Sequence, residues 1–136
     1  GNASISSTDV DDGSGVSCGV ASLSVFPNIF DCSNVGLNSV ELTVTDISEN
    51  SATCISIVTV DDNTAPDALC QSITIQLDDS GNASITSADI DNGSGDVCGI
   101  ESLSISQESF GCENIGENTV TLTVLDVNGN SATCTS

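Results

Sequence analysis

An internal repeat with a period of 80 residues is the feature that most restricts how this chain can fold. Aligned without a gap, residues 1–56 and 81–136 are identical at 32 positions, and the segment Gly1–Ile5 returns unchanged as Gly81–Ile85. Such self-similarity is typical of a tandem array. Because a unit of this length can hold a small hydrophobic core of its own, we expect successive compact modules rather than a thin solenoid.

Apolar residues alternate with polar ones along each unit. In the second unit this alternation runs through Ile73–Leu77, Leu103–Ile105 and Val120–Val124, with turn-forming clusters such as Asn128-Gly129 elsewhere. A period of two predicts half-buried β-strands, and no stretch has helical spacing over three turns. We therefore predict an all-β fold of tandem immunoglobulin-like antiparallel β-sandwich modules with an 80-residue repeat.

The segment Asp61–Asp67 is the expected boundary between the modules. It follows the apolar run Ile55–Val60 and contains Pro66, which cannot serve a central strand. The first module, residues 1–63, then lacks the counterpart of its first strand, and the second module, residues 64–136, lacks the end of its last strand. We expect both ends of the chain to be cut inside a module of a longer protein.

The charge balance excludes several classes of function. The chain has 20 acidic side chains and no Lys, Arg or His, which gives a formal charge of −20. Nucleic acid is excluded as a partner, because phosphate contacts need basic donors. Without His or Lys the usual general bases and nucleophile activators are missing, so we do not expect an enzyme. A glycosidase pair of carboxylates would still need a sugar cleft, which usually has aromatic walls, and the chain has three Phe and no Tyr or Trp.

Cysteine usage indicates the compartment. The chain has seven cysteines, no His and no Cys-x-x-Cys pair, a pattern that favours disulfides over zinc binding or redox catalysis. We therefore expect an extracellular protein. The longest apolar run, Ile55–Val60, has six residues, so we expect no membrane insertion.

Six motifs of the second unit are typical of one module family: Thr64–Pro66, Cys70–Gln71, Gly81–Ala83, Ala88–Ser94, Asp96–Ile100 and Asp126–Cys134. With these motifs the chain resembles the four-cysteine hyalin-repeat-like modules. Such modules occur in long tandem arrays of giant surface proteins of Bacteroidota, including adhesins exported by the type IX secretion system and associated with gliding motility. The resemblance implies a structural module at the cell surface or in a secreted filament. Its partners would be neighbouring modules of the same chain or neighbouring copies in a fibre.

Acidic and amide side chains gather at what we expect to be one pole of the second module. In an immunoglobulin-like topology the incoming linker, the loop after the second strand and the last hairpin share that pole. Together they can supply the roughly six to eight oxygen ligands that Ca²⁺ takes. The candidate metal ligands are Asp61, Asp62, Asn63, Asp67, Asp89, Asp91, Asp96 and Asp126. The alternative is that these residues simply form turns and cap helices.

Three disulfides are expected, namely Cys18–Cys32, Cys98–Cys112 and Cys70–Cys134. The members of the first two pairs lie 14 positions apart and frame one strand. The third pair would join the first and last strands of the sandwich, which often run side by side. By the same repeat, the partner of Cys54 would lie 64 positions earlier, before Gly1, so we expect Cys54 to have no partner within this chain.

These observations predict a structural repeat of an extracellular adhesin stalk or surface filament, stiffened by calcium and disulfides. The alternative is a calcium-dependent carbohydrate-binding module. An exposed cation with open coordination positions beside a groove would favour the carbohydrate-binding module. A closed cation site buried between modules would favour the stalk.

Overall fold

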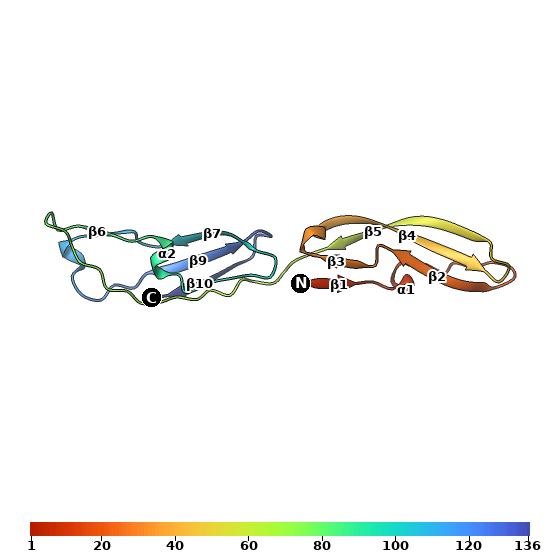
Figure 1. The fold of residues 1–136 in the computed structure, drawn as a ribbon, viewed down its shortest axis with the longest axis horizontal. Helices are drawn as coiled ribbons and strands as arrows, with labels where there is room; N and C mark the ends of the chain where they lie inside the picture. The colour runs from red at the N-terminus through yellow and green to blue at the C-terminus, as the bar shows by residue number, and fades with distance from the viewer. The chain divides into compact units, whose positions relative to one another are not determined.

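The chain folds into two similar units. The computed structural model describes residues 1–136, which divide into Gly1–Asp62 and Asn63–Ser136 (Figure 1). Each unit is built mainly of antiparallel β-sheet, and each contains one two-stranded and one three-stranded sheet. None of the short helices has the length and apolar character that a membrane span requires.

Unit 1 begins with a short strand and a single helical turn and ends with a long hairpin. Its elements are β1 (Asn2–Ser4), α1 (Ser7–Val10), β2 (Val20–Phe26), β3 (Ile29–Asp31), the 3₁₀-helix η1 (Cys32–Asn34), β4 (Gly36–Asp46) and β5 (Ser51–Val60). Strand β1 pairs with β3, and β4 lies between β2 and β5 in the larger sheet. The β4–β5 register runs from Thr45 opposite Ser51 to Gly36 opposite Val60.

Unit 2 repeats this order with shorter strands. Its elements are β6 (Ala83–Ser84), α2 (Ser87–Ile90), β7 (Ile100–Ile105), β8 (Ser109–Phe110), the 3₁₀-helix η2 (Cys112–Asn114), β9 (Thr121–Asp126) and β10 (Ser131–Thr135). Strand β6 pairs with β8, and β9 lies between β7 and β10. The alternating segments Leu103–Ile105 and Thr121–Val124 therefore lie in strands, as their period of two predicted, and Val120 directly precedes β9.

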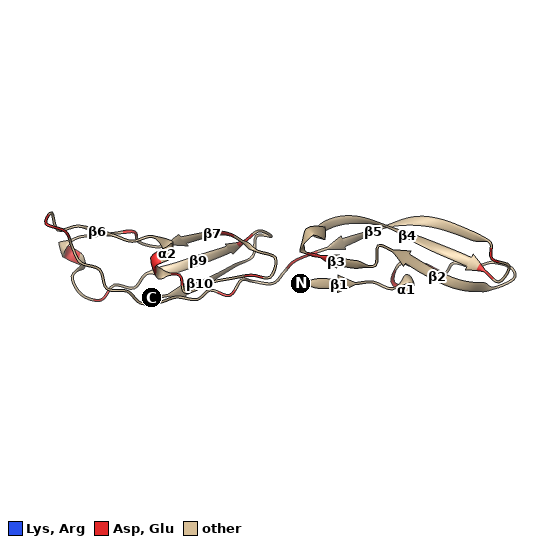
Figure 2. Cartoon of the chain, in the orientation of Figure 1, with Lys and Arg blue, Asp and Glu red and all other residues tan.

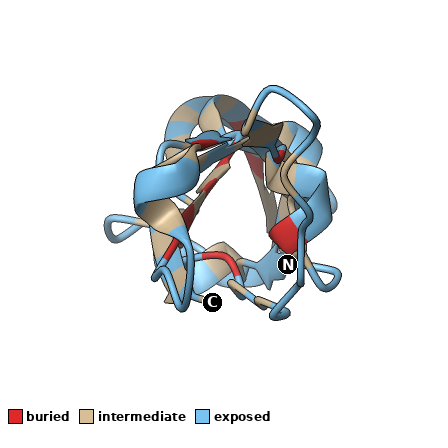
Figure 3. Ribbon diagram, turned by 90° about the vertical axis from the view of Figure 1, so that its left-hand side faces the viewer, coloured by how far each residue is buried: buried red, intermediate tan, exposed pale blue.

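The core of unit 2 lies along β9. Leu122 and Val124 are both 0% exposed, and the apolar side chains that surround them are Ile85, Ile90, Phe110 and Val120. Figure 3 shows the buried positions as short stretches between half-buried and exposed ones. This pattern is the physical consequence of alternation, because every second side chain of a strand points away from the core.

Unit 1 has a smaller core, formed by Phe30, Val40 and Leu42. Four of its residues are only half-buried although their counterparts 80 positions later are buried, namely Ile5, Val10, Val44 and Asp46. In unit 2, Ala68 and Cys70 also pack against the core. These contacts contribute to the tighter core of unit 2.

The expected strand at Ile73–Leu77 is not formed. This stretch runs along unit 2 without a strand partner (Figure 1). The chain before it is tied to the rest of the unit by isolated bridges, Asp67–Gly95 and Cys70–Asp91, and by the disulfide Cys70–Cys134. A strand is defined by the backbone hydrogen bonds of a neighbour, and no neighbouring strand lies beside residues 73–77. The apolar residues of this stretch alternate as described, but the prediction that the stretch pairs with a neighbouring strand was wrong.

Candidate functional site

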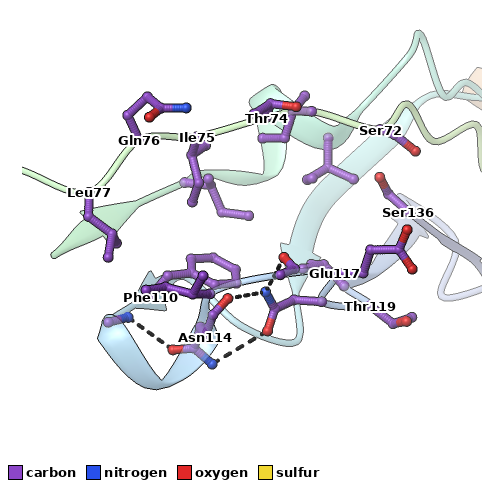
Figure 4. A pocket seen from close by; sticks show the side chains of 18 residues that line it. Ser72, Thr74, Ile75, Gln76, Leu77, Phe110, Asn114, Glu117, Thr119 and Ser136 are labelled. Carbon is purple, nitrogen blue, oxygen red and sulfur yellow. Dashed lines mark hydrogen bonds between the residues drawn. The ribbon is translucent and has the colours of Figure 1, made fainter. Parts of the chain in front are cut away.

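A groove is the main concave feature of unit 2. Its volume is about 760 Å³, and it lies between the segment Ser72–Leu77 and the loop Asn114–Val120. Ile75 and Leu77 point into the groove, and the ring of Phe110 forms part of the opposite wall, whereas Gln76 points away (Figure 4). The lining of the groove is therefore mixed, with these apolar side chains beside polar residues such as Asn114 and Glu117.

The loop Asn114–Val120 holds its shape through one amide side chain. Nδ2 of Asn118 donates to the carbonyl oxygen of Asn114 at 2.7 Å and to that of Gly116 at 3.2 Å. At the end of the loop, Val120 and Ser136 exchange two backbone hydrogen bonds, each of 2.9 Å. The backbone N–H groups from Gly116 to Thr119 make no such bond. One rim of the groove therefore carries a row of unpaired backbone donors.

The β9–β10 hairpin is closed by Asp126, whose side chain is fully buried. Oδ1 of Asp126 accepts the N–H groups of Asn128 at 2.9 Å and Asn130 at 2.7 Å, and Oδ2 accepts Nδ2 of Asn130 at 2.8 Å. Burial acts to raise the pKa of Asp126, but the hydrogen bonds from Asn130 and Asn128 outweigh it and lower the pKa below its ordinary value. Local N–H donors therefore stabilise this buried negative charge without any basic side chain.

Two other turns use the same arrangement. In the β4–β5 hairpin, Asp46 accepts the backbone N–H of Asn50 at 2.9 Å and its side-chain amide at 3.0 Å. Asp78 accepts the backbone N–H of Asn82 at 2.9 Å. An Asp followed four residues later by an Asn is thus a recurrent turn motif of this chain, and its carboxylate serves to close the turn.

Acidic side chains also cap the two helical turns. Oδ2 of Asp89 accepts the N–H of Thr86 at 2.7 Å and its hydroxyl at 2.7 Å, and Asp9 binds Ser6 in the same way at the start of α1. The hydrogen bonds from Thr86 lower the pKa of Asp89. These are reciprocal capping interactions, in which one carboxylate satisfies donors that the short helix leaves unpaired.

The candidate metal ligands therefore differ in how fully their carboxylates are engaged. Asp89 and Asp126 have the roles described above, and Oδ1 of Asp91 accepts the N–H of Ser94 at 2.9 Å. Oδ1 of Asp96 accepts only the N–H of Cys98, at 2.7 Å. The remaining candidates lie on the linker, where Asp61 and Asp62 end unit 1 and Asn63 begins unit 2, and at Asp67. In Figure 2 the acidic residues lie mostly in turns and loops, and no basic residue accompanies them.

Backbone hydrogen bonds bring three acidic segments of unit 2 to one end. Asp67 exchanges two bonds with Gly95, of 2.8 and 3.0 Å, so the start of the unit lies beside the loop that contains Asp96. That loop contacts the β9–β10 hairpin, because the N–H of Val127 donates to the carbonyl of Gly99 at 3.2 Å. We call this end, made of Asp67, residues 95–99 and residues 126–130, the acidic pole of unit 2.

One polar atom at the acidic pole is left unsatisfied. Oδ1 of Asn128 is buried and has no hydrogen-bond partner. A buried carbonyl oxygen normally has a partner, which can be a protein donor, a water molecule or a cation. This oxygen and the partly engaged carboxylate of Asp96 are the donors that best fit a hard cation.

The cysteines correct part of the expected disulfide pattern. Cys18 and Cys112 are free and exposed thiols, whereas Cys32 and Cys98 are each disulfide-bonded. The expected pairs Cys18–Cys32 and Cys98–Cys112 are therefore wrong. A strand separates the members of each pair, and the six residues of β7 alone rise by about 20 Å. A disulfide requires Cα atoms within about 7 Å, so two cysteines at opposite ends of a strand cannot meet.

The pair Cys70–Cys134 is confirmed, with a Cα–Cα distance of 5.8 Å. Cys54 is a free, exposed thiol, as the repeat predicted. Cys70, which bonds the counterpart residue Cys134, packs against the core of unit 2. The chain has two disulfides, which indicates an oxidising environment.

Two features of the site were missed in the sequence. The Asn partners of the buried or turn-closing carboxylates were not singled out, although the Asp-x-x-x-Asn spacing occurs in both hairpins and was available as a signal. The groove was also missed. Its signal was the apolar stretch Ile73–Leu77, because Ile75 and Leu77 point into the groove.

Comparisons with known proteins do not assign the chain to a group. No protein-family model, no curated protein and no solved structure matches it.

Proposed function

We propose that the chain represents two successive units of an extracellular structural array, such as the stalk of a surface adhesin or a surface filament. The observation that supports this most is that the 80-residue sequence repeat is also a structural repeat. Both units have the same order of strands, and their long hairpins share one register and one Asp–Asn turn closure. A chain made of repeated, self-contained units is suited to spanning distance, since it can be lengthened without any change of fold.

Covalent and local interactions stabilise these units where a large core cannot. The disulfide Cys70–Cys134 joins residues 64 positions apart, and the turns are closed by carboxylates rather than by apolar contacts. Small extracellular domains commonly rely on such bridges because their buried apolar area is limited. With two disulfides and no Lys or Arg, the chain offers no cleavage site to trypsin-like proteases. That property suits an exposed fibre.

We also propose that each unit is an immunoglobulin-like sandwich. The two-stranded and three-stranded sheets of each unit would be its two layers.

Calcium would neutralise the acidic pole of unit 2. The proposal is supported by the unsatisfied Oδ1 of Asn128, by the partly engaged carboxylate of Asp96, and by the absence of any basic side chain. Asp67 would add a third oxygen ligand from the neighbouring bridge. The carboxylates of Asp89, Asp91 and Asp126 would stay in their turns. Their task is to keep the loops in place.

Thermal unfolding followed by circular dichroism tests this part of the proposal. At a calcium concentration of a hundred times the dissociation constant, binding to the native state alone adds about 2.7 kcal/mol. That gain should raise the melting temperature of unit 2 by about 10 to 20 °C. The variant Asp96→Asn should lose most of the rise, whereas Asp79→Asn, a matched change in a distant turn, should keep it. Equal melting curves in calcium and in a chelator would show that calcium does not stabilise the units.

A further inference from the structure

The outer face of the three-stranded sheet of unit 1 carries exposed apolar side chains. Val40 and Leu42 of β4 face the core, so the odd-numbered residues of β4 point outward, together with the residues of β2 and β5 that pair with them. The large apolar side chains on this outer face, which we call the outer apolar cluster, are Phe26, Leu37, Ile55 and Ile57. They are 78%, 78%, 65% and 57% exposed, respectively.

The members of the cluster are neighbours across the strands. Phe26 and Ile55 pair with Glu41 from opposite sides, so both strands lie about 5 Å from that of Glu41. Ile57 is the next outward residue of β5, and Leu37 on β4 is its diagonal neighbour. The cluster is therefore one continuous patch, and Glu41 is the only charged side chain at the outward positions of β2, β4 and β5.

The repeat does not fold another of its own segments over this face. In unit 2, which includes the residues 63–82 that precede β6, the outward side chains of the three-stranded sheet are exposed as well, among them Ser104, Thr133 and Thr135. Unit 1 contains the remaining part of the 80-residue period, residues 57–62, and its outer face is exposed too. The exposure of the face is therefore a property of the repeat.

The apolar character of the face, in contrast, is particular to unit 1. In unit 2 the positions that correspond to Phe26, Leu37 and Ile55 hold polar residues, namely Ser106, Glu117 and Thr135. Solvent-exposed strand positions are commonly polar, as they are in unit 2. The fold therefore does not require apolar side chains at these positions, and their presence in unit 1 needs another explanation.

The size of the cluster suits contact with a second copy of this chain. At the exposures given above, the four side chains present on the order of 500 Å² of apolar surface, and patches of this size on soluble proteins are often interaction sites. Two copies packed face to face would bury about 1,000 Å², which is the lower limit of a specific interface. The hydroxyl-bearing residues beside the cluster would add to this area.

Charge restricts where two copies can meet. The chain has 20 acidic side chains and no basic one, so contact through most of its surface brings like charges together. Beside the cluster, the next row across the sheet carries only hydroxyl side chains, namely Ser24, Thr43 and Thr53. A two-fold arrangement that places Glu41 of one copy against this row of the other copy supplies hydroxyl donors to the carboxylate. The face is therefore complementary to itself.

We propose that the outer face of the three-stranded sheet of unit 1 is a self-association surface, on which the apolar clusters of two copies of this chain pack against each other. This inference deepens the proposed array and rests on it, because it assigns the cluster to the lateral contact between neighbouring stalks or filaments. Units with a polar outer face, such as unit 2, make no such contact.

Sedimentation equilibrium of the full chain tests the proposal. The exposed thiols of Cys18, Cys54 and Cys112 are blocked beforehand, so that no disulfide forms between copies. We expect a reversible dimer with a dissociation constant of about 100 μM or tighter at about 0.15 M salt. Raising the salt concentration to about 1 M should tighten the dimer at least about threefold, because salt screens the repulsion between acidic copies and does not weaken apolar packing.

Exchanging residues between the two units supplies the variants. In F26S/I55T, unit 1 receives the residues that unit 2 has at these positions, and the dissociation constant should rise by at least about tenfold. The control I29S also replaces an exposed apolar residue with its counterpart in unit 2, but it lies on β3 in the other sheet and should leave the constant unchanged. All three positions are exposed, and circular dichroism checks that the variants fold.

Three outcomes would count against the proposal. A chain that stays monomeric up to about 1 mM at both salt concentrations would overturn it, and the cluster would then face a partner other than this chain. A dimer that F26S/I55T leaves intact, or that I29S weakens equally, would overturn the assignment to this face. Stiff, elongated arrays built from chains that do not associate would leave the proposed function intact and refute only this inference.

Discussion

Removing the disulfide Cys70–Cys134 should destabilise unit 2 selectively. The bond joins residues 64 positions apart, and closing a loop of this length reduces the entropy of the unfolded chain by an amount worth about 4 kcal/mol. Small domains have a total stability of only about 5 to 15 kcal/mol, so this is a large share. The double variant C70A/C134A avoids a lone thiol. Unit 1 serves as an internal control, because the corresponding Cys54 is free.

Amide hydrogen exchange measures this effect in both units of one molecule. The amides of Leu122 and Val124 in β9 should exchange about a thousandfold faster in the variant, which corresponds to about 4 kcal/mol. The amides of Leu42 and Val44 in β4 should change by less than about threefold, because distant sites act independently. If the free energy of opening measured at the β9 amides falls by less than about 1 kcal/mol, the disulfide does not constrain the unfolded chain as argued. An equal fall at the β4 amides would contradict the independence of the two units.

Three further predictions concern single residues. Glu49 has a φ of 65°, a left-handed conformation that glycine adopts more easily, and unit 2 has Gly129 at the corresponding position. Glu49→Gly should therefore stabilise unit 1 by about 0.5 to 1 kcal/mol, and slower amide exchange in β4 would show this gain. Phe30 is 2% exposed and Phe26 is 78% exposed. Denaturant unfolding should therefore show that Phe30→Ala lowers the free energy of unfolding by about 3 kcal/mol or more, and that Phe26→Ala lowers it by less than about 0.5 kcal/mol. The pKa of Asp126 is lowered on folding, so its stabilisation is complete above about pH 4 and is lost as the pH falls through the lowered pKa. Asp126→Asn should make acid unfolding of unit 2 less steep, and an unchanged steepness would contradict this role.

The strands were predictable because alternation reports burial directly. Leu122 and Val124 are buried on one face of β9 and Thr123 is half-exposed between them, as a period of two requires. The stretch Ile73–Leu77 shows the same alternation without becoming a paired strand. Alternation identifies the side that faces a core, but hydrogen-bond pairing depends on a neighbouring strand that lies elsewhere in the sequence.

The cysteine pattern shows the same division between local and long-range information. The pair Cys70–Cys134 was predicted from the expectation that the first and last strands of a sandwich run side by side, and the structure contains this disulfide. The pair Cys98–Cys112 was inferred from a short separation in sequence, which β7 converts into a long separation in space. Sequence distance is a guide to a disulfide only when the chain between the two cysteines reverses direction.

The acidic residues were predicted to be cation ligands, with turn formation as the alternative, and the structure places several of their carboxylates in turns. The burial of the Asp126 carboxylate could not have been predicted from composition, because the buried charge is stabilised by the N–H groups of Asn128 and Asn130. A charge can be buried without an opposite charge when enough hydrogen-bond donors surround it.

The dimensions of longer arrays test the central proposal most directly. Recombinant chains with two, four and eight repeats can be compared by small-angle X-ray scattering in calcium and in a chelator. A stiff structural array predicts that the maximum dimension in calcium doubles, or nearly doubles, with each doubling of the repeat number. Flexibly joined units would lengthen by only about 1.4-fold at each doubling. That scaling in calcium, or collapse into a compact particle, would contradict the array proposed for this chain.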